Sequence, residues 1–550
     1  MEVVPSVESY AGPKDKHTWL KWTIAALVAI LNGYAAVMMY ASGEWVFALL
    51  DLVVVSVGLY VFMNKKTYAH RYIFPGVAGM VVFIIFPLAY TIGIAFTNYS
   101  GSNLLSIEQA RDYHLKKTYK VAGGEFDFTL LGGDNGQFQL LLTQEQQSYL
   151  SQPLALMNNK ARELAVREGR VQNLAQEVRL EPVTGDVTGK AAPIRAIVDH
   201  RTHLSALDLV LPDGTTHLTL SSLRKFAAQK QQYSRLTDGA VLKSGVVIKD
   251  SNLLRDNQRG ELMLPNGETG FYQYIDEQGQ FVGKSVAPGF VVSVGWKNFA
   301  RIVTDPGIQA PFLQIFVWTV IFSACSVAFT LAIGMVLACL VQWESLKGRG
   351  FYRVMLILPY AIPAFISILV FKGLFNQNFG EINMFLEAAF GIKPDWYTNP
   401  FLAKVMILIV NTWLGYPYMM ILCMGLLKAI PEDLYEASAM DGAGPVQNFF
   451  KITVPLLMKP LTPLLIASFA FNFNNFVLIQ LLTNGAPDII GASTPAGTTD
   501  LLVSYTYRIA FQGSGGQDYG LASAIATAIF LIVGALALLN LKLSKADKQL

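Results

Sequence analysis

Long apolar runs divide this chain, and they constrain its fold more than any other feature. Eight of them approach the roughly 20 apolar residues that a helix needs to cross a bilayer. The composition agrees, since 53% of the residues are hydrophobic, 15% are charged and the mean hydropathy is +0.39. We therefore predict an all-α polytopic membrane protein with eight transmembrane helices, near residues 19–41, 46–63, 72–96, 312–342, 352–372, 402–427, 456–482 and 519–541.

A long polar segment after the third run is predicted to be a separate domain. It divides the chain into three helices over 1–96, an inserted domain over 97–311, and five helices over 312–550. Turn signals in the insert predict three hairpins and a mainly β fold. Their sequences are Asn135-Gly136, Pro212-Asp213-Gly214 and Pro265-Asn266-Gly267. Residues 144–180 carry helix formers with few breakers, so we expect a helical insertion there.

The cations in the short connections predict which side of the membrane each connection occupies. Only Lys372, Lys393 and Arg508 lie on one side. Because cytoplasmic loops carry an excess of Lys and Arg, we expect the more basic side to be cytoplasmic, with both termini there and the inserted domain outside. Its fifteen cations are Lys14, Lys16, Lys21, Lys65, Lys66, Arg71, Lys347, Arg349, Arg353, Lys428, Lys451, Lys459, Lys542, Lys545 and Lys548.

A polar island over 431–455, between the sixth and seventh runs, carries a recognisable spacing. Glu-Ala is followed after four residues by Gly442, and then by Ile452 and Pro455. Proline and carboxylates at its start and glycine after Met440 predict two short helices joined by a bend. This spacing resembles the EAA loop, through which membrane subunits of ABC importers contact a separate ATPase. The residues that the resemblance assigns to ATPase coupling are Glu436, Ala437, Ser438, Asp441 and Gly442.

The island departs from the family pattern at two positions, and the chain carries no phosphate-binding loop of its own. Ser438 stands where a second alanine is usual, and Val454 where leucine is usual. The segment Gly185–Ala191 has one residue too few between its glycines and lacks a hydroxyl after Lys190. We therefore expect that the chain is not an enzyme and binds no cofactor directly, with ATP and magnesium on a partner ATPase.

Polar side chains recur at helical spacing in the sixth and seventh runs. Amides, hydroxyls and aromatic rings without a net charge suit a neutral sugar, but interhelical packing explains the same pattern, and both hypotheses stay open here. Asp51, in the second run, is the one acid that an ion-coupled carrier could use. The two polar stripes are Asn411, Leu414, Gly415 and Tyr418, and Ser468, Phe471, Asn472 and Asn475.

The resemblance extends beyond the island to residues 341–344, 411–420 and 468–476, and to a large domain after the third span. In these features the chain resembles the larger permease subunit of the maltose/maltodextrin ABC importers. The resemblance implies a second permease, an ATPase homodimer, a periplasmic maltose-binding protein and an immunoglobulin-like external domain. It also implies a membrane sugar site, formed by Leu414, Gly415, Tyr418, Ser468, Phe471, Asn472 and Asn475.

The function predicted from these features is ATP-driven import of maltose and maltodextrins across a bacterial inner membrane. A periplasmic binding protein would deliver the sugar, and alternating access of the membrane site would release it into the cytoplasm. A permease for another α-glucoside or oligosaccharide is the alternative, followed by an ion-coupled sugar carrier. A membrane-anchored sensor is a third alternative, but it leaves the two polar stripes unexplained. Nothing in the composition suggests a nucleic-acid partner.

Overall fold

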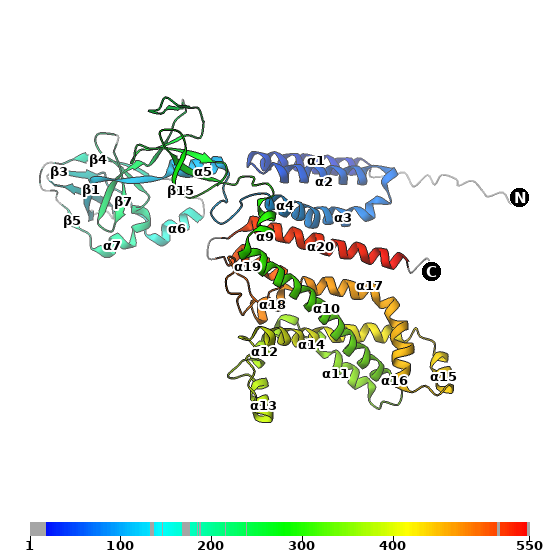
Figure 1. Cartoon of the computed structure of the whole chain (residues 1–550). Coiled ribbons are helices and arrows are strands. Elements are labelled where there is room, and N and C mark those ends of the chain that lie inside the picture. The colour runs from blue at the N-terminus through cyan, green and yellow to red at the C-terminus, as the bar shows by residue number, and fades with distance from the viewer. Residues whose placement is uncertain are drawn as a thin grey trace. The chain divides into compact units, whose positions relative to one another are not determined.

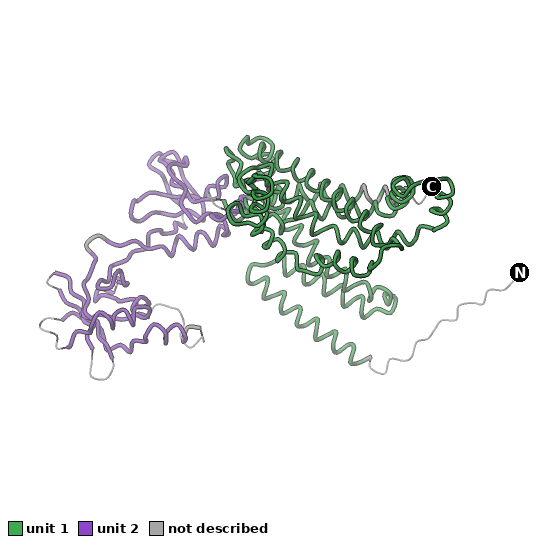
Figure 2. Tube along the Cα trace, turned by 90° about the horizontal axis from the view of Figure 1, so that it is seen from below, with its two compact units in different colours: residues 1–97, 295–514, 519–550 green, residues 98–294, 515–518 purple. Residues whose placement is uncertain are grey.

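The chain folds into two compact units, coloured separately in Figure 2. The helical unit comprises residues 1–97, 295–514 and 519–550, and the sheet unit comprises residues 98–294 and 515–518. The computed structural model describes residues 18–132, 137–145, 147–167, 176–183, 185, 187, 189–214, 216–237, 239–513 and 517–546.

Helices make up the helical unit, as its apolar runs predict (Figure 1). Its first part contains α1 (Thr18–Ala41), α2 (Trp45–Met63), η1 (Lys65–Thr67), α3 (His70–Met80), the π-helical η2 (Val81–Ile85) and α4 (Phe86–Ala95). Its second part contains α9 (Lys297–Thr304), α10 (Pro306–Gln342), α11 (Arg349–Ala361), α12 (Ala364–Leu374), α13 (Glu381–Phe390), α14 (Pro400–Leu427), α15 (Asp433–Met440), α16 (Pro445–Asn448), the π-helical η3 (Phe449–Thr453), α17 (Val454–Phe473), α18 (Phe476–Leu482), α19 (Leu502–Phe511) and α20 (Tyr519–Ala546).

Seven helical segments of the described chain are long and apolar enough to span a bilayer, and α11 with α12 makes an eighth if that bent pair is one span. The polytopic helical fold is thereby confirmed. The run predicted as one helix over 352–372 is bent by 91° between α11 and α12. Pro363 explains the bend, because a residue before proline avoids the helical region and Ile362 is extended (φ −88°, ψ 131°).

The seventh span begins earlier in the structure than the sequence predicts. Helical structure runs without a break from Pro445 to Phe473, whereas we predicted a new span from about residue 456. Pro455 therefore starts no separate helix. A π-helical turn over Phe449–Thr453 precedes this proline, and such a turn changes the backbone hydrogen-bonding pattern where proline has no N–H to donate.

Small residues allow α10 and α14 to pack closely. At Gly334 of α10, a Cβ atom would lie 2.7 Å from both the backbone nitrogen of Met420 and Cβ of Met419. Only glycine permits this approach of two helices, a packing device common in membrane bundles. Met335, Met420 and Cys423 are buried in the apolar cluster around this contact.

The sheet unit contains two main β-sheets, confirming the mainly β domain. Its elements are α5 (Ile107–Lys116), β1 (Thr118–Gly132), β2 (Phe138–Gln144), β3 (Gln147–Ser151), α6 (Asn159–Arg167), β4 (Gln176–Pro182), β5 (Lys190–Ala191), α7 (Ile194–Asp199), α8 (Arg201–Leu204), β6 (Leu207–Val210), β7 (His217–Ser222), β8 (Lys225–Gln231), β9 (Tyr233–Arg235), β10 (Ala240–Val241), β11 (Val247–Ile248), β12 (Leu254–Asp256), β13 (Leu262–Asn266), β14 (Phe271–Ile275) and β15 (Phe281–Val286).

The larger sheet has the strand order β2-β3-β4-β6-β7-β8-β1-β5, and β1 also pairs with β2. Seven strands therefore close into a ring, which leaves fewer exposed strand edges. Inside it lies an apolar cluster that includes Phe128, Leu140, Leu209 and Phe226. The smaller sheet has the order β15-β14-β13-β12-β9 and packs on α5. The immunoglobulin-like arrangement that the resemblance implies is not confirmed.

All three predicted hairpins pair as expected. In the first, β1 and β2 are antiparallel, although the turn residues Asn135 and Gly136 lie outside the described residues. In the second, β6 pairs with β7, and Asp213 accepts a 3.0 Å hydrogen bond from the backbone N–H of Thr216. In the third, β13 pairs with β14. Turn chemistry in the sequence therefore placed these strands correctly.

The helical insertion predicted over 144–180 is wrong for most of its described length. The one helix there is α6, over Asn159–Arg167, whereas residues 147–151 and 176–182 are the strands β3 and β4. Helix-forming composition is a weak guide here, because both strands complete the closed ring by pairing with distant neighbours. Tertiary pairing overrides the local propensity.

A buried histidine predicts how the sheet unit responds to acid. His114 of α5 packs against the rings of Tyr233 and Tyr272, and its Nε2 lies 3.3 Å from the carbonyl oxygen of Pro288. Burial lowers the pKa of His114 to about 4. The unfolded chain binds the proton below about pH 6.5, so stability should fall as the pH drops from there through 4, by about 3 kcal/mol in all. This loss is measured by unfolding the protein in urea at pH 7 and at pH 4, with protease resistance of the sheet unit as the readout.

His114→Phe should remove most of that pH dependence, since phenylalanine keeps the ring and cannot titrate. His217→Gln is the matched control, because His217 is an exposed histidine of the same unit that bonds Asp208 at 2.8 Å. It should leave the acid sensitivity in place. Equal acid sensitivity in His114→Phe and the unmodified chain would contradict the assignment to His114.

Candidate sugar site and coupling loop

The two predicted polar stripes meet at a break in the seventh span. We predicted one helix over 456–482, but α17 ends at Phe473 and α18 begins at Phe476. Asn475 leaves the helical conformation (φ −76°, ψ 76°), and its side-chain oxygen accepts a 3.4 Å hydrogen bond from the backbone N–H of Leu478. Asparagine favours such caps because its side chain competes with backbone partners. Asn475 therefore does not continue the helical face of Ser468.

Three asparagines nevertheless connect α14 to this break. The side-chain amide of Asn411 donates to the side-chain oxygen of Asn472 at 2.8 Å. The amide of Asn475 donates in turn to the side-chain oxygen of Asn411 at 3.1 Å, and the amide of Asn472 donates to the carbonyl of Ser468 at 2.9 Å. Asn411 and Asn472 are both buried. Their hydrogen bonds support the packing hypothesis for these two residues, since a buried amide without partners is costly.

The other stripe residues differ in exposure. Phe471 is 74% exposed and Tyr418 is 39% exposed, while Leu414 and Ser468 are half-buried. No side-chain hydrogen bond engages the hydroxyl of Ser468 within the described part of the chain. Two aromatic rings and a hydroxyl offer flat apolar faces and polar groups without charge. Such side chains are chemically suited to a neutral polyhydroxylated ligand.

Gly415 has a structural explanation besides sugar binding. A Cβ atom there would lie 2.8 Å from Cγ2 of Thr330 on α10. Glycine at this position therefore lets α14 approach α10, as Gly334 does farther along the same pair of helices. Sequence spacing cannot separate this role from ligand binding, because both place glycine on a polar stripe.

The predicted coupling loop is built as two short helices with a glycine bend. The first helix, α15, ends at Met440, Gly442 has φ +82°, and α16 begins at Pro445. Glu436, Ala437, Asp441 and Gly442 are exposed. Serine at position 438, where the family usually has alanine, has a structural explanation. Its hydroxyl donates to the side-chain oxygen of Asn448 at 3.0 Å.

Exposed apolar side chains at this loop do not stand out in the sequence. Met440 is 89% exposed, and Leu434, Val446 and Phe450 are exposed as well. Each is apolar on its own, so composition could not distinguish it from a membrane-facing residue. Because large exposed apolar patches mark interaction sites, we add these four residues to the candidate contact surface.

Asp51 has a partner and lies on a helix without predicted sugar-site residues. Its carboxylate accepts a hydrogen bond from the side-chain amide of Asn32 on α1. An acid paired in this way does not need an ion ligand to offset its burial. The structure therefore provides no separate support for an ion-coupled mechanism through Asp51.

A buried ion cluster holds the connection between α18 and α19. Arg508 of α19 donates to Asp500 at 2.9 Å and to Asp488 at 2.7 Å. Asp500 is fully buried and also accepts hydrogen bonds from Ser504 and from the backbone of Gly497. In the sequence Arg508 counts only as an external cation, because nothing local indicates its burial. The cluster fixes the backbone that follows α18.

Three known families match separate parts of the chain. Residues 19–66 match the family described as MalF, N-terminal region, transmembrane helices, and residues 105–295 match Maltose transport system permease protein MalF P2 domain. Residues 330–543 match Binding-protein-dependent transport system inner membrane component.

Curated relatives match over almost their full length. The Maltose/maltodextrin transport system permease protein MalF of Vibrio cholerae is 56% identical over 537 residues, 98% of this chain and 97% of the relative. The protein with the same description from Escherichia coli K12 is 55% identical, over 97% of this chain and 98% of the relative. A solved bacterial ABC transporter involved in alginate import is 21% identical, with a TM-score of 0.40 over 46% of this chain and 84% of that chain.

Proposed function

The chain belongs to the MalF family of maltose/maltodextrin permeases of binding-protein-dependent ABC importers, and we propose that its sugar passes over the face formed by Tyr418 and Phe471. The single observation that supports this site is their exposure on α14 and α17, the two helices that the buried Asn411 and Asn472 connect. The described residues leave both rings exposed, 39% for Tyr418 and 74% for Phe471. A second permease subunit facing them would enclose the sugar between the two proteins.

The family supplies the substrate class, and the local chemistry supplies the roles. Tyr418 and Phe471 would pack against the CH-rich faces of glucose units, and the Ser468 hydroxyl would exchange hydrogen bonds with sugar hydroxyls. Leu414 would add apolar contact, whereas Gly415, Asn472 and Asn475 would shape the site by keeping α14, α17 and α18 in place. Their hydrogen bonds and close contacts support this division of roles.

The loop from α15 to α16 is proposed to bind the ATPase. Its exposed Glu436 and Asp441 and the apolar side chain of Met440 would enter a complementary cleft of that partner. ATP and magnesium would be held by an ATPase homodimer, and the sugar would arrive on a periplasmic maltose-binding protein. The excess of cations near this loop supports a cytoplasmic position for it and for both termini, with the sheet unit in the periplasm.

Alternating access follows from these contacts. Closure of the ATPase pair would draw the coupling loops of the two permeases together and open the membrane site outward. Hydrolysis would release the loops, and the site would then face the cytoplasm. The break at Asn474 and Asn475 provides a point at which α18 can change its angle to α17, since hinges are short segments at the ends of elements.

Import of another α-glucoside or oligosaccharide is the second candidate within the same mechanism. The exposed aromatic pair would accept many glucosides, because stacking on a ring distinguishes poorly between neutral sugars. Competition for uptake among maltose, longer maltodextrins and other α-glucosides separates these cases.

The double substitution Tyr418→Ala with Phe471→Ala tests the membrane site. We expect sugar-stimulated ATPase activity of the reconstituted complex to fall by about 30-fold, since two aromatic contacts at about 1 kcal/mol each are lost. Both side chains are exposed, so co-purification with the partner permease and ATPase should persist. The measurement is ATPase activity against sugar concentration in the presence of the binding protein.

Trp413→Ala with Ile409→Ala is the matched control, because both are exposed apolar residues of α14 outside the predicted stripe. This control should keep its sugar dependence. If Tyr418→Ala with Phe471→Ala assembles and retains normal sugar stimulation, the proposed site is wrong.

A further inference from the structure

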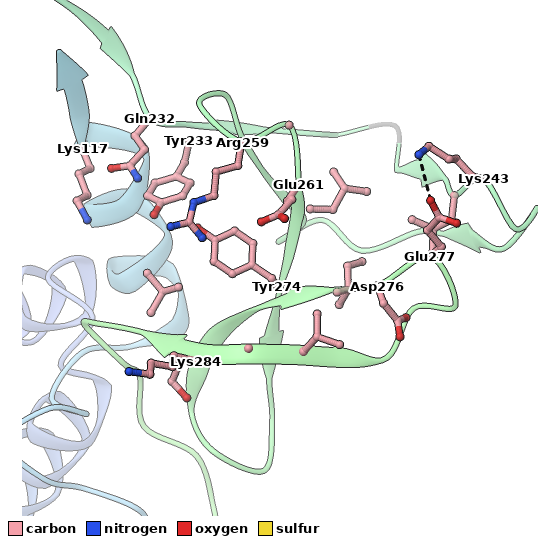
Figure 3. Close-up of a pocket in the computed structure, with 18 of the residues that line it drawn as sticks. Lys117, Gln232, Tyr233, Lys243, Arg259, Glu261, Tyr274, Asp276, Glu277 and Lys284 are labelled. Carbon is pink, nitrogen blue, oxygen red and sulfur yellow. Dashed lines mark ion pairs between the residues drawn. The ribbon is translucent and has the colours of Figure 1, made fainter. Parts of the chain in front are cut away.

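A groove in the sheet unit has no role in the function proposed above. It lies between the β10–β11 hairpin and the strands β13, β14 and β15, with a cavity volume of about 1140 Å³ (Figure 3). Ligand pockets usually measure roughly 300–1,000 Å³, so this groove can hold several sugar rings rather than one. All the residues that form it belong to the sheet unit.

The hairpin is held against the neighbouring turn, so the groove is a formed feature. Lys243 of the hairpin pairs with Glu277 at 3.0 Å, as the dashed line in Figure 3 marks. The hydroxyl of Ser244 donates to the backbone carbonyl of Glu277. These two contacts hold one end of the groove without using its central side chains.

Polar groups of both signs face the central space. Figure 3 shows Arg259 beside the rings of Tyr233 and Tyr274, with Glu261 directed into the same space. The Arg259 guanidinium lies 5.4 Å from the ring centre of Tyr274, whose hydroxyl donates to Asp256 at 2.8 Å. Within the described residues, Arg259 and Glu261 form no ion pair. The Arg259 guanidinium can therefore donate to a ligand, and the Glu261 carboxylate can accept from it. The Tyr274 ring beside Arg259 is held in place by its hydrogen bond to Asp256.

Apolar surface lies between these polar groups. Val241 of β10 and Val282 of β15 line the groove and are exposed, and Leu262 of β13 is half-buried in it. Lys117 and Lys284 add two further donors toward the end away from the hairpin. The lining thus alternates donors, acceptors and aliphatic patches.

Two classes of ligand fit this lining poorly. An extended peptide would add to the free edge of β15, but Gly283 there has φ +75° and the pairing with β14 is irregular. Bulges and edge lysines such as Lys284 oppose strand addition. A small anion would be drawn to Arg259 but repelled by Glu261 and Asp276. A neutral ligand with many hydroxyls can use both signs at once.

We propose that this groove binds an α-linked glucose oligosaccharide, a maltodextrin of several units, separately from the membrane site. The identity of the sugar rests on the proposed function. Arg259 and Glu261 bind hydroxyls, and Val241, Val282 and Leu262 contact the CH-rich faces. The groove is open, and Arg259 and Glu261 are exposed to water, so the Kd is on the order of 1 mM. Such a site retains long maltodextrins beside the importer.

The test uses the full chain with its partner subunits in phospholipid nanodiscs, because maltoside detergents would compete. Maltohexaose binding is followed by saturation-transfer NMR in the absence of the binding protein. Arg259→Ala with Glu261→Gln should weaken binding about tenfold in a chain that also carries Tyr418→Ala and Phe471→Ala, which removes the membrane site. Arg179→Ala with Glu177→Gln is the matched control, an exposed pair of opposite charges on β4.

The outcomes separate this inference from the proposed function. It is supported if the groove variant loses maltohexaose binding and the control keeps it, and if Arg259→Ala with Glu261→Gln in a chain with an intact membrane site leaves maltose-stimulated ATPase activity with the binding protein unchanged. Equal binding by the groove variant and the control overturns it. So does preferential binding of an acidic peptide, tested with oligoglutamate. The variant with only Tyr418→Ala and Phe471→Ala tests the membrane site. Its loss of maltose-stimulated ATPase activity would support that site and leave the result for the groove unchanged.

Discussion

Replacement of Glu436 by lysine is expected to reduce binding-protein-dependent ATPase activity by about 100-fold. Glu436 is exposed on α15, where its carboxylate is free to pair with a cation of the ATPase. Reversal of one charge at an interface places like charges together and costs several kcal/mol. The fold of the loop should survive, because the hydrogen bond between Ser438 and Asn448 does not involve Glu436. Co-purification of the ATPase and its sugar-stimulated turnover measure the effect.

Glu432→Lys is the matched control for this prediction. Glu432 is an exposed carboxylate of the same loop that precedes the first turn of α15. It carries the same charge change at a position outside the family spacing. We expect a much smaller loss of activity there. Full coupling in Glu436→Lys, or equal losses in both variants, would argue against a specific role for Glu436.

The second large effect is expected from Arg508→Met. This change leaves the buried carboxylate of Asp500 without its cation, and removal of one partner from a buried ion pair typically costs about 3–5 kcal/mol. The connection between α18 and α19 should loosen near Asp500, although two hydrogen bonds to α10 stay in place. Trp318 donates to the backbone of Thr499, and Thr319 accepts from the backbone of Leu502 at the start of α19. Thermal unfolding of the purified complex and protease resistance of this segment measure the loss.

Two further variants isolate the buried charge as the cause. Asp488→Asn should cost less than about 1 kcal/mol, because its carboxylate is exposed and water screens the pair. Arg508→Met with Asp500→Asn should regain part of the stability, since no uncompensated charge then stays buried. If Arg508→Met is as stable as Asp488→Asn, the cluster does not hold the connection.

The sequence predicted the parts of this protein that local chemistry decides. Runs of apolar residues located the spans, since crossing a bilayer requires a minimum helical length. Turn residues such as Asp213 located hairpins, because their side chains cap the turn itself. The bend at Gly442 was predicted for the same kind of reason, as glycine adopts positive φ without strain.

The positions of the residues assigned to the candidate sugar site followed from the sequence only in part. Spacing placed Tyr418 and Phe471 on polar helical faces, and both are exposed. It also placed Asn472 and Asn475 on one helix face, whereas the helix breaks between them. The sequence alone does not reveal that break. The preference of Asn475 for a helix cap competes with continuation of the helix, and its hydrogen bond to Asn411 on α14 favours the break.

The sequence by itself determined that this chain spans a membrane, carries an inserted β-rich domain and presents a loop with the spacing of an ABC-importer permease. Those features depend on residue type over short distances. Only the tertiary structure decided which polar residues hydrogen-bond between helices and where the seventh span breaks. It also decided that Arg508 is buried and bonded to two aspartates. These depend on partners far apart in the sequence, such as Asn411 and Asn472, whose contact exists only once the helices have packed.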